Sequence, residues 1–153
     1  MITIIQRVSS ASVTVNNATI ATINQGILAL VAIEKQDDAP RVEKLLQRIL
    51  NYRIFCDSNN RMNLSLKQIN GGLLLVPQFT LAADTNTGNR PSFTPAAAPA
   101  HGEKMFNHLI TTAQSQYSTV ESGLFGADMQ VSLTNDGPVT FTLQSKSNTL
   151  FHQ

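Results

Sequence analysis

The chain of 153 residues, 42% of them hydrophobic, is long enough for one domain with a sizeable core, and no apolar run in it is long enough to span a membrane. Its formal net charge of +1 gives no support to broad binding along a nucleic-acid backbone, which needs a clear excess of Lys and Arg, but leaves open the recognition of one nucleotide end. Its single cysteine, Cys56, excludes an internal disulfide and a multi-cysteine metal site and favours a reducing, cytoplasmic setting.

Apolar residues in the first part of the chain follow a strand-like pattern. Residues 2–9 and 12–15 predict two strands, and residues 19–23 predict a third. The continuous apolar run 27–33 predicts a strand that is buried on both faces. Arg7 stands among apolar neighbours in the first strand. It is either a surface arginine at an edge or a buried guanidinium that needs hydrogen-bond acceptors.

Two amphipathic helices are predicted. The first is preceded by Asp37 and Asp38, either of which can cap a helix, and has Pro40 in its first turn. Its apolar face consists of Val42, Leu45, Leu46, Ile49 and Leu50. The apolar face of the second helix consists of Met105, Phe106, Leu109, Ile110 and Ala113. We expect His101 and His108 to lie on its polar face, and we expect no metal site because no Cys or carboxylate stands at ligand spacing.

The remaining elements are shorter. Residues 52–55 predict a short strand, and Cys56 is interpreted as a small packed thiol. Residues 73–76 predict another buried strand, and residues 130–133 predict a later one. Residues 82–99 show little periodicity and form a long loop of the kind that often carries function. Two helices and about eight strands predict a mixed α/β domain, with two packed, largely antiparallel sheets in a barrel-like arrangement and the helices covering one of them.

One candidate site is the segment PQFTL (77–81), which follows a buried strand. The backbone N–H groups around Phe79 and Thr80 are suited to hold a developing oxyanion. Alternatively, Phe79 and Leu81 are core residues and Thr80 is a capped hydroxyl. Thr80 is the only candidate nucleophile near Gln78. A hydroxyl needs a base to become reactive, and the sequence supplies no obvious acid–base set beside it.

The second candidate is the segment NDGPVT (135–140). Glycine lets a backbone approach a ligand closely, and proline carries no N–H, so the neighbouring carbonyls are free to point outward. From spacing alone, a tight turn between two strands and a trans Gly-Pro bond are favoured. A functional role requires a partner segment, which 77–81 supplies.

Four segments resemble the bacterial D-aminoacyl-tRNA deacylases, also called D-tyrosyl-tRNA deacylases. They are QFTLAADT (78–85), GNRPSF (88–93), FGADMQVSL (125–133) and NDGPVTF (135–141). The resemblance extends from Met1 to about Gln144 and departs at Pro77, where the family usually has serine. It implies one deacylase domain over residues 1–144, with residues 145–153 as a flexible C-terminal extension.

The resemblance implies an activity as well as a fold. Members of the family hydrolyse the ester bond between a D-amino acid and the 3′ end of tRNA, which serves as chiral proofreading in translation, and glycine is expected as a further substrate. They need no metal or cofactor, have no membrane partner and act in the cytoplasm. They are homodimers with active sites at the interface.

Roles for particular residues follow from the resemblance. The residues at the ester are Gln78, Phe79 and Thr80, with main-chain N–H groups as donors and the 2′-OH of the substrate assisting the attack. The other substrate-binding residues are Leu81, Phe125 and Met129, the last two at the terminal adenine.

The chiral filter is assigned to three further residues. Gly137 and Pro138 are expected to form a cis pair that enters the active site of the partner subunit, where main-chain carbonyls exclude L-side chains. Arg7 is expected to hold this pair by hydrogen bonding.

Two other functions stay open at this point. One is a tRNA deacylase of the same fold with altered substrate choice, through Pro77 or a trans Gly-Pro bond. The other is a non-catalytic module that binds RNA 3′ ends. The intact segments 78–81 and 137–138 argue against the second.

Overall fold

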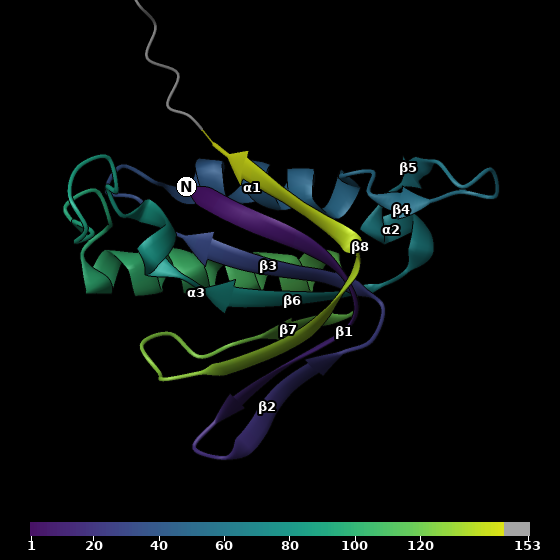
Figure 1. The fold of residues 1–153 in the computed structure, drawn as a ribbon, viewed down its shortest axis with the longest axis horizontal. Coiled ribbons are helices and arrows are strands. Elements are labelled where there is room, and N and C mark those ends of the chain that lie inside the picture. Colours follow the sequence, from purple (N-terminus) through teal and green to yellow (C-terminus); the bar gives the residue numbers. More distant parts are fainter. Residues whose placement is uncertain (146–153) are drawn as a thin grey trace, which may run out of the picture.

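The computed structural model describes residues 1–145 (Figure 1). In chain order the elements are β1 (Ile2–Val15), β2 (Ala18–Ile23), β3 (Gly26–Ala32), α1 (Ala39–Asn51), β4 (Phe55–Cys56), β5 (Met62–Leu64), α2 (Leu66–Ile69), β6 (Gly72–Pro77), the 3₁₀ helix η1 (Phe79–Ala82), α3 (Pro99–Gln116), β7 (Val120–Ser122) and β8 (Gln130–Gln144). The extension predicted for residues 145–153 lies, from residue 146 onward, outside the described residues. Within residues 1–145, no helix is long and apolar enough to cross a bilayer.

A six-stranded sheet organises the fold. Its strand order is β2-β1-β3-β6-β7, and β8 pairs with the other edge of β1. All pairs that involve β1 are antiparallel, whereas β3–β6 and β6–β7 are parallel. The predicted mixed and largely antiparallel α/β architecture is therefore confirmed.

The two predicted sheets are two parts of one folded sheet. β1 pairs with β3 through residues 2–8 and with β2 through residues 11–15, while β8 follows it along almost its whole length. The register between β1 and β8 shifts between Val8 and Ser10, and such an irregularity lets a strand bend without ending. The prediction of two separate strands over residues 2–9 and 12–15 was therefore wrong, because a single bent strand passes through both layers (Figure 1).

The domain has two apolar cores. The first core lies between the sheet and helices α1 and α3, and includes Ile27, Leu73 and Leu75. The second lies between the two layers, and includes Leu28 and Leu74. Because successive side chains of a strand point to opposite faces, β3 and β6 serve both cores, which confirms that they are buried on both sides.

Both long helices form as the sequence predicts, and a third, short one was missed. Asp38 caps α1, since its side chain accepts a hydrogen bond from Arg41 N at 3.1 Å. The short helix α2 begins at a capping box, in which Ser65 and Gln68 satisfy each other's backbone N–H groups. This Ser-x-x-Gln spacing is visible in the sequence and would have indicated the helix.

The hairpin of β4 and β5 projects from the body of the molecule (Figure 1). β4 begins at Phe55, later than predicted, and its side chains alternate, so Phe55 is buried and Cys56 is exposed. The interpretation of Cys56 as a packed thiol was therefore wrong. In the loop that joins the strands, hydrogen bonds from the backbone N–H of Arg61, from Asn63 and from the backbone N–H of Asn59 lower the pKa of the Asp57 carboxyl.

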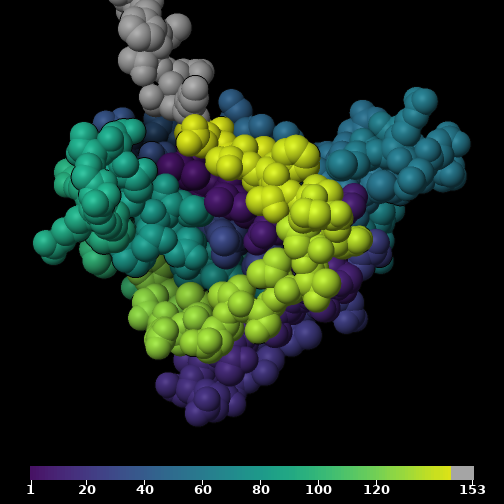
Figure 2. All heavy atoms as spheres, viewed as in Figure 1, coloured from purple at the N-terminus to yellow at the C-terminus, as the bar shows by residue number. Residues whose placement is uncertain are grey.

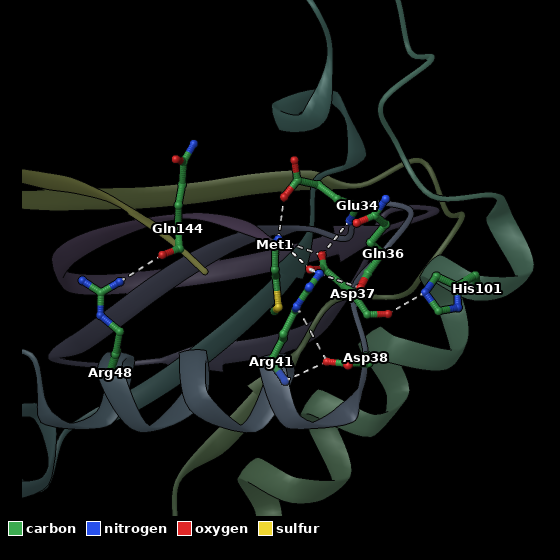
Figure 3. Close-up of polar contacts among 9 residues, drawn as sticks. All are labelled: Met1, Glu34, Gln36, Asp37, Asp38, Arg41, Arg48, His101 and Gln144. Carbon is green, nitrogen blue, oxygen red and sulfur yellow. Dashed lines mark hydrogen bonds and ion pairs between the residues drawn. The ribbon is translucent and has the colours of Figure 1, made fainter. Parts of the chain in front are cut away.

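The amino group of Met1 is fully buried in a polar cluster (Figure 3). It donates to Glu34 Oε2 at 2.5 Å and to Asp37 Oδ1 at 2.8 Å. The Asp37 side chain is 1% exposed and also accepts from Glu34 N at 2.8 Å. His101 of α3 contacts the Asp37 backbone carbonyl at 2.8 Å. These contacts join the start of β1 to the segment before α1 and to α3.

Candidate active site

A cavity of about 460 Å³ lies where β6 ends. Four residues of the predicted site line it: Gln78, Phe79, Phe125 and Met129. The lining residues that were not predicted are Val76, Pro77, Ala97, Pro99, Gly126, Ala127 and Val131. Figure 2 shows the segment around residues 80–100 beside the segment around residues 124–131 on this face of the molecule.

The end of β6 positions Gln78 and Phe79. Gln78 N donates to Val31 O at 2.7 Å, which fixes the chain against β3 before it turns into η1. The Phe79 side chain is 56% exposed, so Phe79 is not a core residue, and Leu81 is half-buried. Leu81 does not line the 460 Å³ cavity, although it was predicted to bind substrate.

Two backbone N–H groups at the start of η1, those of Phe79 and Thr80, can bind a ligand, whereas later ones are used within the turn. Leu81 N donates to Gln78 O at 3.2 Å, and Ala83 N donates to Thr80 O at 3.1 Å. The N–H groups of Phe79 and Thr80 have no acceptor among residues 1–145. The first N–H groups of a helix lack internal partners, so these two are available to a ligand, as an oxyanion hole requires.

The hydroxyl of Thr80 is held by an amide. Gln78 Nε2 donates to Thr80 Oγ1 at 2.5 Å. In the described part of the chain, no histidine or carboxylate contacts this hydroxyl. Within residues 1–145, the hydroxyl of Thr80 therefore has no general base in contact with it.

The opposite wall of the cavity is fixed by α3 and by the segment after β7. The ring of Phe125 packs against Phe106, with the ring centroids 6.3 Å apart. Gly102 of α3 leaves room for this ring, because a Cβ at that position would lie only 3.2 Å from Phe125 Cζ. Met129 Sδ lies 3.4 Å from Leu124 N. This wall is largely apolar and contains an aromatic ring, as is typical of pockets that bind small organic ligands.

Arg7, Gly137 and Pro138 meet in a bulge of β8. Gln6 pairs with Thr140 and Val8 pairs with Asn135, so the single residue Arg7 faces residues 136–139. The tight turn favoured by spacing is therefore wrong, because β8 continues past the Gly-Pro pair and stays paired with β1. The Gly137–Pro138 bond is cis, as the resemblance implies.

Arg7 lies between the two alternatives, because it is only partly buried but has the backbone acceptors that a buried guanidinium needs. Its side chain is 12% exposed. Nε donates to Asp136 O at 2.8 Å, and Nη1 donates to Ile54 O at 2.7 Å. These bonds join the bulge of β8 to the segment between α1 and β4.

Within one chain, the Gly-Pro bulge and the cavity lie apart. Arg7 pairs with Ile27 near the start of β3, whereas Gln78 is bonded to Val31 near its end. Four residues of a strand span roughly 13 Å. One chain therefore brings the predicted ester-binding residues to one place and the predicted chiral filter to another.

Metal-binding residues are not gathered anywhere in residues 1–145, where no group of three or more His, Cys, Asp or Glu side chains is close enough to share an ion. His108 contacts Glu43 at 3.0 Å, and His101 contacts the backbone of Asp37. Both histidines lie on the polar side of α3, as predicted.

Comparison with solved structures finds the same fold in two other proteins. A chain described as c-Myc DNA Unwinding Element Binding Protein superposes with a TM-score of 0.92 at 35% identity, over 96% of this chain and 100% of the other. A probable eukaryotic D-amino acid tRNA deacylase has the same fold, with a TM-score of 0.79 at 18% identity, over 93% of this chain and 97% of that one.

Sequence comparison identifies the family. The family described as D-Tyr-tRNA(Tyr) deacylase matches residues 4–144. The D-aminoacyl-tRNA deacylase of Nitrosococcus oceani is 57% identical over 94% of this chain and 93% of its own length. That of Methylococcus capsulatus is 59% identical over 94% of each chain. The chain belongs to the D-Tyr-tRNA(Tyr) deacylase family.

Pro77 is tolerated at the end of β6, and we predict that Pro77→Ser changes deacylation less than about tenfold, or roughly 1.4 kcal/mol in barrier. The pairing of β6 with β7 ends at Leu75 and Ser122, so the missing N–H of Pro77 leaves no strand partner unsatisfied there. Steady-state hydrolysis of D-tyrosyl-tRNA by the two proteins tests this. A much larger gain in the serine variant would mean that Pro77 impairs the enzyme or alters its substrate choice.

Proposed function

We propose that this chain hydrolyses the ester bond between a D-amino acid, or glycine, and the 3′ end of tRNA, giving the free amino acid and tRNA. The reaction serves as chiral proofreading in translation and takes place in the cytoplasm. Family membership over residues 4–144 supports the reaction class. The observation that carries the proposal is that Gln78, Phe79, Phe125 and Met129 line one cavity, beside two backbone N–H groups that have no acceptor among residues 1–145.

The reaction uses the backbone rather than a side-chain nucleophile. The ester carbonyl lies at the first turn of η1, where the N–H groups of Phe79 and Thr80 stabilise its developing negative charge. The terminal adenine lies in the cavity against Phe125 and Met129. The 2′-OH of the ribose assists the attack on the neighbouring ester. This assistance from the substrate replaces a general base, which no side chain of residues 1–145 provides beside Thr80.

The decisive experiment compares D-tyrosyl-tRNA with L-tyrosyl-tRNA as substrates. We expect release of D-tyrosine and little release of L-tyrosine. Hydrolysis of both esters would favour a deacylase with altered substrate choice. Binding of the tRNA without hydrolysis of either would favour a module that binds RNA 3′ ends.

Thr80→Ala is expected to retain substantial deacylation, because the proposed donors are backbone groups and, within residues 1–145, the hydroxyl is hydrogen-bonded to Gln78 alone. Single-turnover hydrolysis of D-tyrosyl-tRNA measures the retained rate. Mass spectrometry of the wild-type protein, quenched during turnover, provides the second readout. An aminoacyl group attached to Thr80 would show that the hydroxyl is the nucleophile.

The functional unit is a homodimer with active sites at the interface. The Gly-Pro bulge lies roughly 13 Å along β3 from Gln78 in the same chain, so a second copy is needed to bring a Gly-Pro pair to each cavity. Gly137 and Pro138 of the partner then present main-chain carbonyls to the amino acid, and Arg7 holds them in place. A side chain of L configuration is rejected by steric clash, whereas glycine, which has no side chain, is accepted.

Sedimentation of the protein during turnover tests this assembly. We expect a dimer at every concentration that shows full activity. An active monomer would exclude a filter supplied by a second chain.

A further inference from the structure

The segment GNRPSF (88–93) has no role in the reaction as described so far, yet it carries a ring that packs against Phe79, a residue that lines the cavity. The rings of Phe79 and Phe93 lie with centroids 5.1 Å apart and planes tilted by 55°. Both are exposed, Phe79 by 56% and Phe93 by 44%. Large apolar rings on a surface are a common means of binding unpaired bases.

The loop that carries Phe93 is held at its base. Asp84 N donates to Ser92 O at 2.8 Å, and Ser92 N donates to Asp84 O at 3.0 Å. The carboxylate of Asp84 is engaged within the loop, where Oδ1 accepts from the N–H of Asn86 at 3.0 Å and from its side-chain amide at 2.7 Å. After the loop, Ala97 N donates to Ile33 O at 3.1 Å, so the position of Phe93 is fixed from both ends.

The same loop carries a cation. Arg90 is exposed, and its guanidinium forms no ion pair with any of residues 1–145. It stands two residues before Ser92, where the loop closes, and three before Phe93. An aromatic ring and an unpaired arginine on one short, fixed loop are the two components of a single-stranded nucleic-acid site.

We propose that Phe93 stacks on the base that precedes the 3′-terminal adenosine of the tRNA, and that Arg90 contacts the phosphate backbone beside it. The inference rests on the proposed function, which places the ester at Phe79 and the terminal adenine against Phe125 and Met129 in the same cavity. Phe79 and Phe125 line one cavity, and Phe93 packs against Phe79. A strand whose last base lies in this cavity can therefore bring the preceding base, roughly 3.4 Å further along when the two are stacked, to the ring of Phe93. The loop thereby distinguishes a polynucleotide from a lone aminoacyl-adenosine.

The test compares two substrates, D-tyrosyl-tRNA and D-tyrosyl-adenosine, which has the ester and the adenine but no preceding nucleotide. Phe93→Ala is expected to lower kcat/KM for D-tyrosyl-tRNA by about tenfold, the effect of losing one stacked base. It is expected to leave kcat/KM for D-tyrosyl-adenosine within about twofold of wild type. Phe93→Tyr keeps a stacking ring and is the matched control, with wild-type behaviour on both substrates.

Equal losses on both substrates would mean that Phe93 acts by positioning Phe79, and no loss on D-tyrosyl-tRNA would mean that its ring meets no base. Either result overturns the inference. The affinity for an uncharged RNA oligonucleotide ending in CCA, measured by fluorescence anisotropy, does not depend on hydrolysis. Unchanged affinity in Phe93→Ala also overturns the inference, whereas reduced affinity in a protein that hydrolyses neither substrate would reject the proposed function and retain the RNA contact.

Arg90→Gln tests the second contact. Each phosphate contact to a single strand contributes about 0.7 to the slope of log affinity against log salt, so this slope should fall by about that amount for the oligonucleotide. Arg61→Gln is the matched control, because Arg61 is exposed in the loop that joins β4 and β5. Figure 1 shows this hairpin on the opposite side of the molecule from the loop that precedes α3. An equal change in both variants would mean that Arg90 acts only through the overall charge of the protein and makes no specific phosphate contact.

Discussion

Gly137→Ala is expected to lower kcat/KM for D-tyrosyl-tRNA about a hundredfold or more, the effect of displacing a substrate-contacting group by about 1 Å. Gly137 has a φ of +146°, which L-residues with a side chain rarely adopt. An added Cβ would lie 2.7 Å from Val139 Cγ2 and 3.1 Å from Arg7 Nη2. The backbone of the bulge must therefore move, and the proposed filter moves with it.

The fold of this variant is expected to survive, because Gly137 is exposed and the change is confined to a bulge. Thr142→Ala, at an exposed position of β8 that pairs with Ile4, is the control for general effects on the strand. Circular dichroism and sedimentation establish that both variants are folded and assembled alike. A folded Gly137→Ala dimer with wild-type turnover would remove Gly137 from the active site.

Arg7→Ala tests the same filter by removing the side chain that holds Gly137 and Pro138 in place. The change removes the hydrogen bonds to Asp136 O and Ile54 O without adding an atom to the bulge. We expect a smaller loss of D-tyrosyl-tRNA hydrolysis than in Gly137→Ala, together with a lower ratio of D to L turnover. A loss of rate with an unchanged ratio would mean that Arg7 supports the fold and not the selection.

Asp37→Asn is expected to lower the free energy of unfolding by about 3 kcal/mol, the usual cost of removing one partner from a buried ion pair. The carboxylate accepts from the buried amino group of Met1 and from Glu34 N. An amide keeps the size of the side chain but leaves the ammonium with Glu34 as its only carboxylate among residues 1–145, and the Glu34 side chain is 38% exposed.

The neighbouring residue provides the control for this prediction. Asp38 caps α1 from an exposed position, and asparagine is an equally good cap, so Asp38→Asn should be nearly neutral. Urea denaturation of the two variants measures the difference. Equal stabilities would mean that the buried ammonium does not depend on the Asp37 carboxylate.

The spacing of apolar residues correctly predicted the helices and strands that are surrounded by one uniform environment. The apolar stripes gave α1 and α3, and the continuous apolar run gave β3, because a single environment decides each of these patterns. The bend of β1 and the bulge of β8 were missed. Each depends on how two distant strands pair, and Asn135–Pro138 carries the same signals in a bulge as in a turn.

The cavity was only partly predictable for a similar reason. Gln78, Phe79, Phe125 and Met129 came from the resemblance, and the structure places all four at one cavity. Ala97 and Pro99 carry no functional group, so their contribution is shape. Only the packing of the long loop against the start of α3 shows that they face the cavity.

The passage of β1 and β8 through both layers also determines how the protein opens. β1 pairs with β2, β3 and β8, and its side chains belong to both apolar cores. Neither layer can separate without breaking strands of the other, so we expect the two layers to unfold together as one cooperative unit. The amide protons of β1 should therefore exchange only when the whole molecule unfolds, while those of the projecting β4–β5 hairpin exchange earlier.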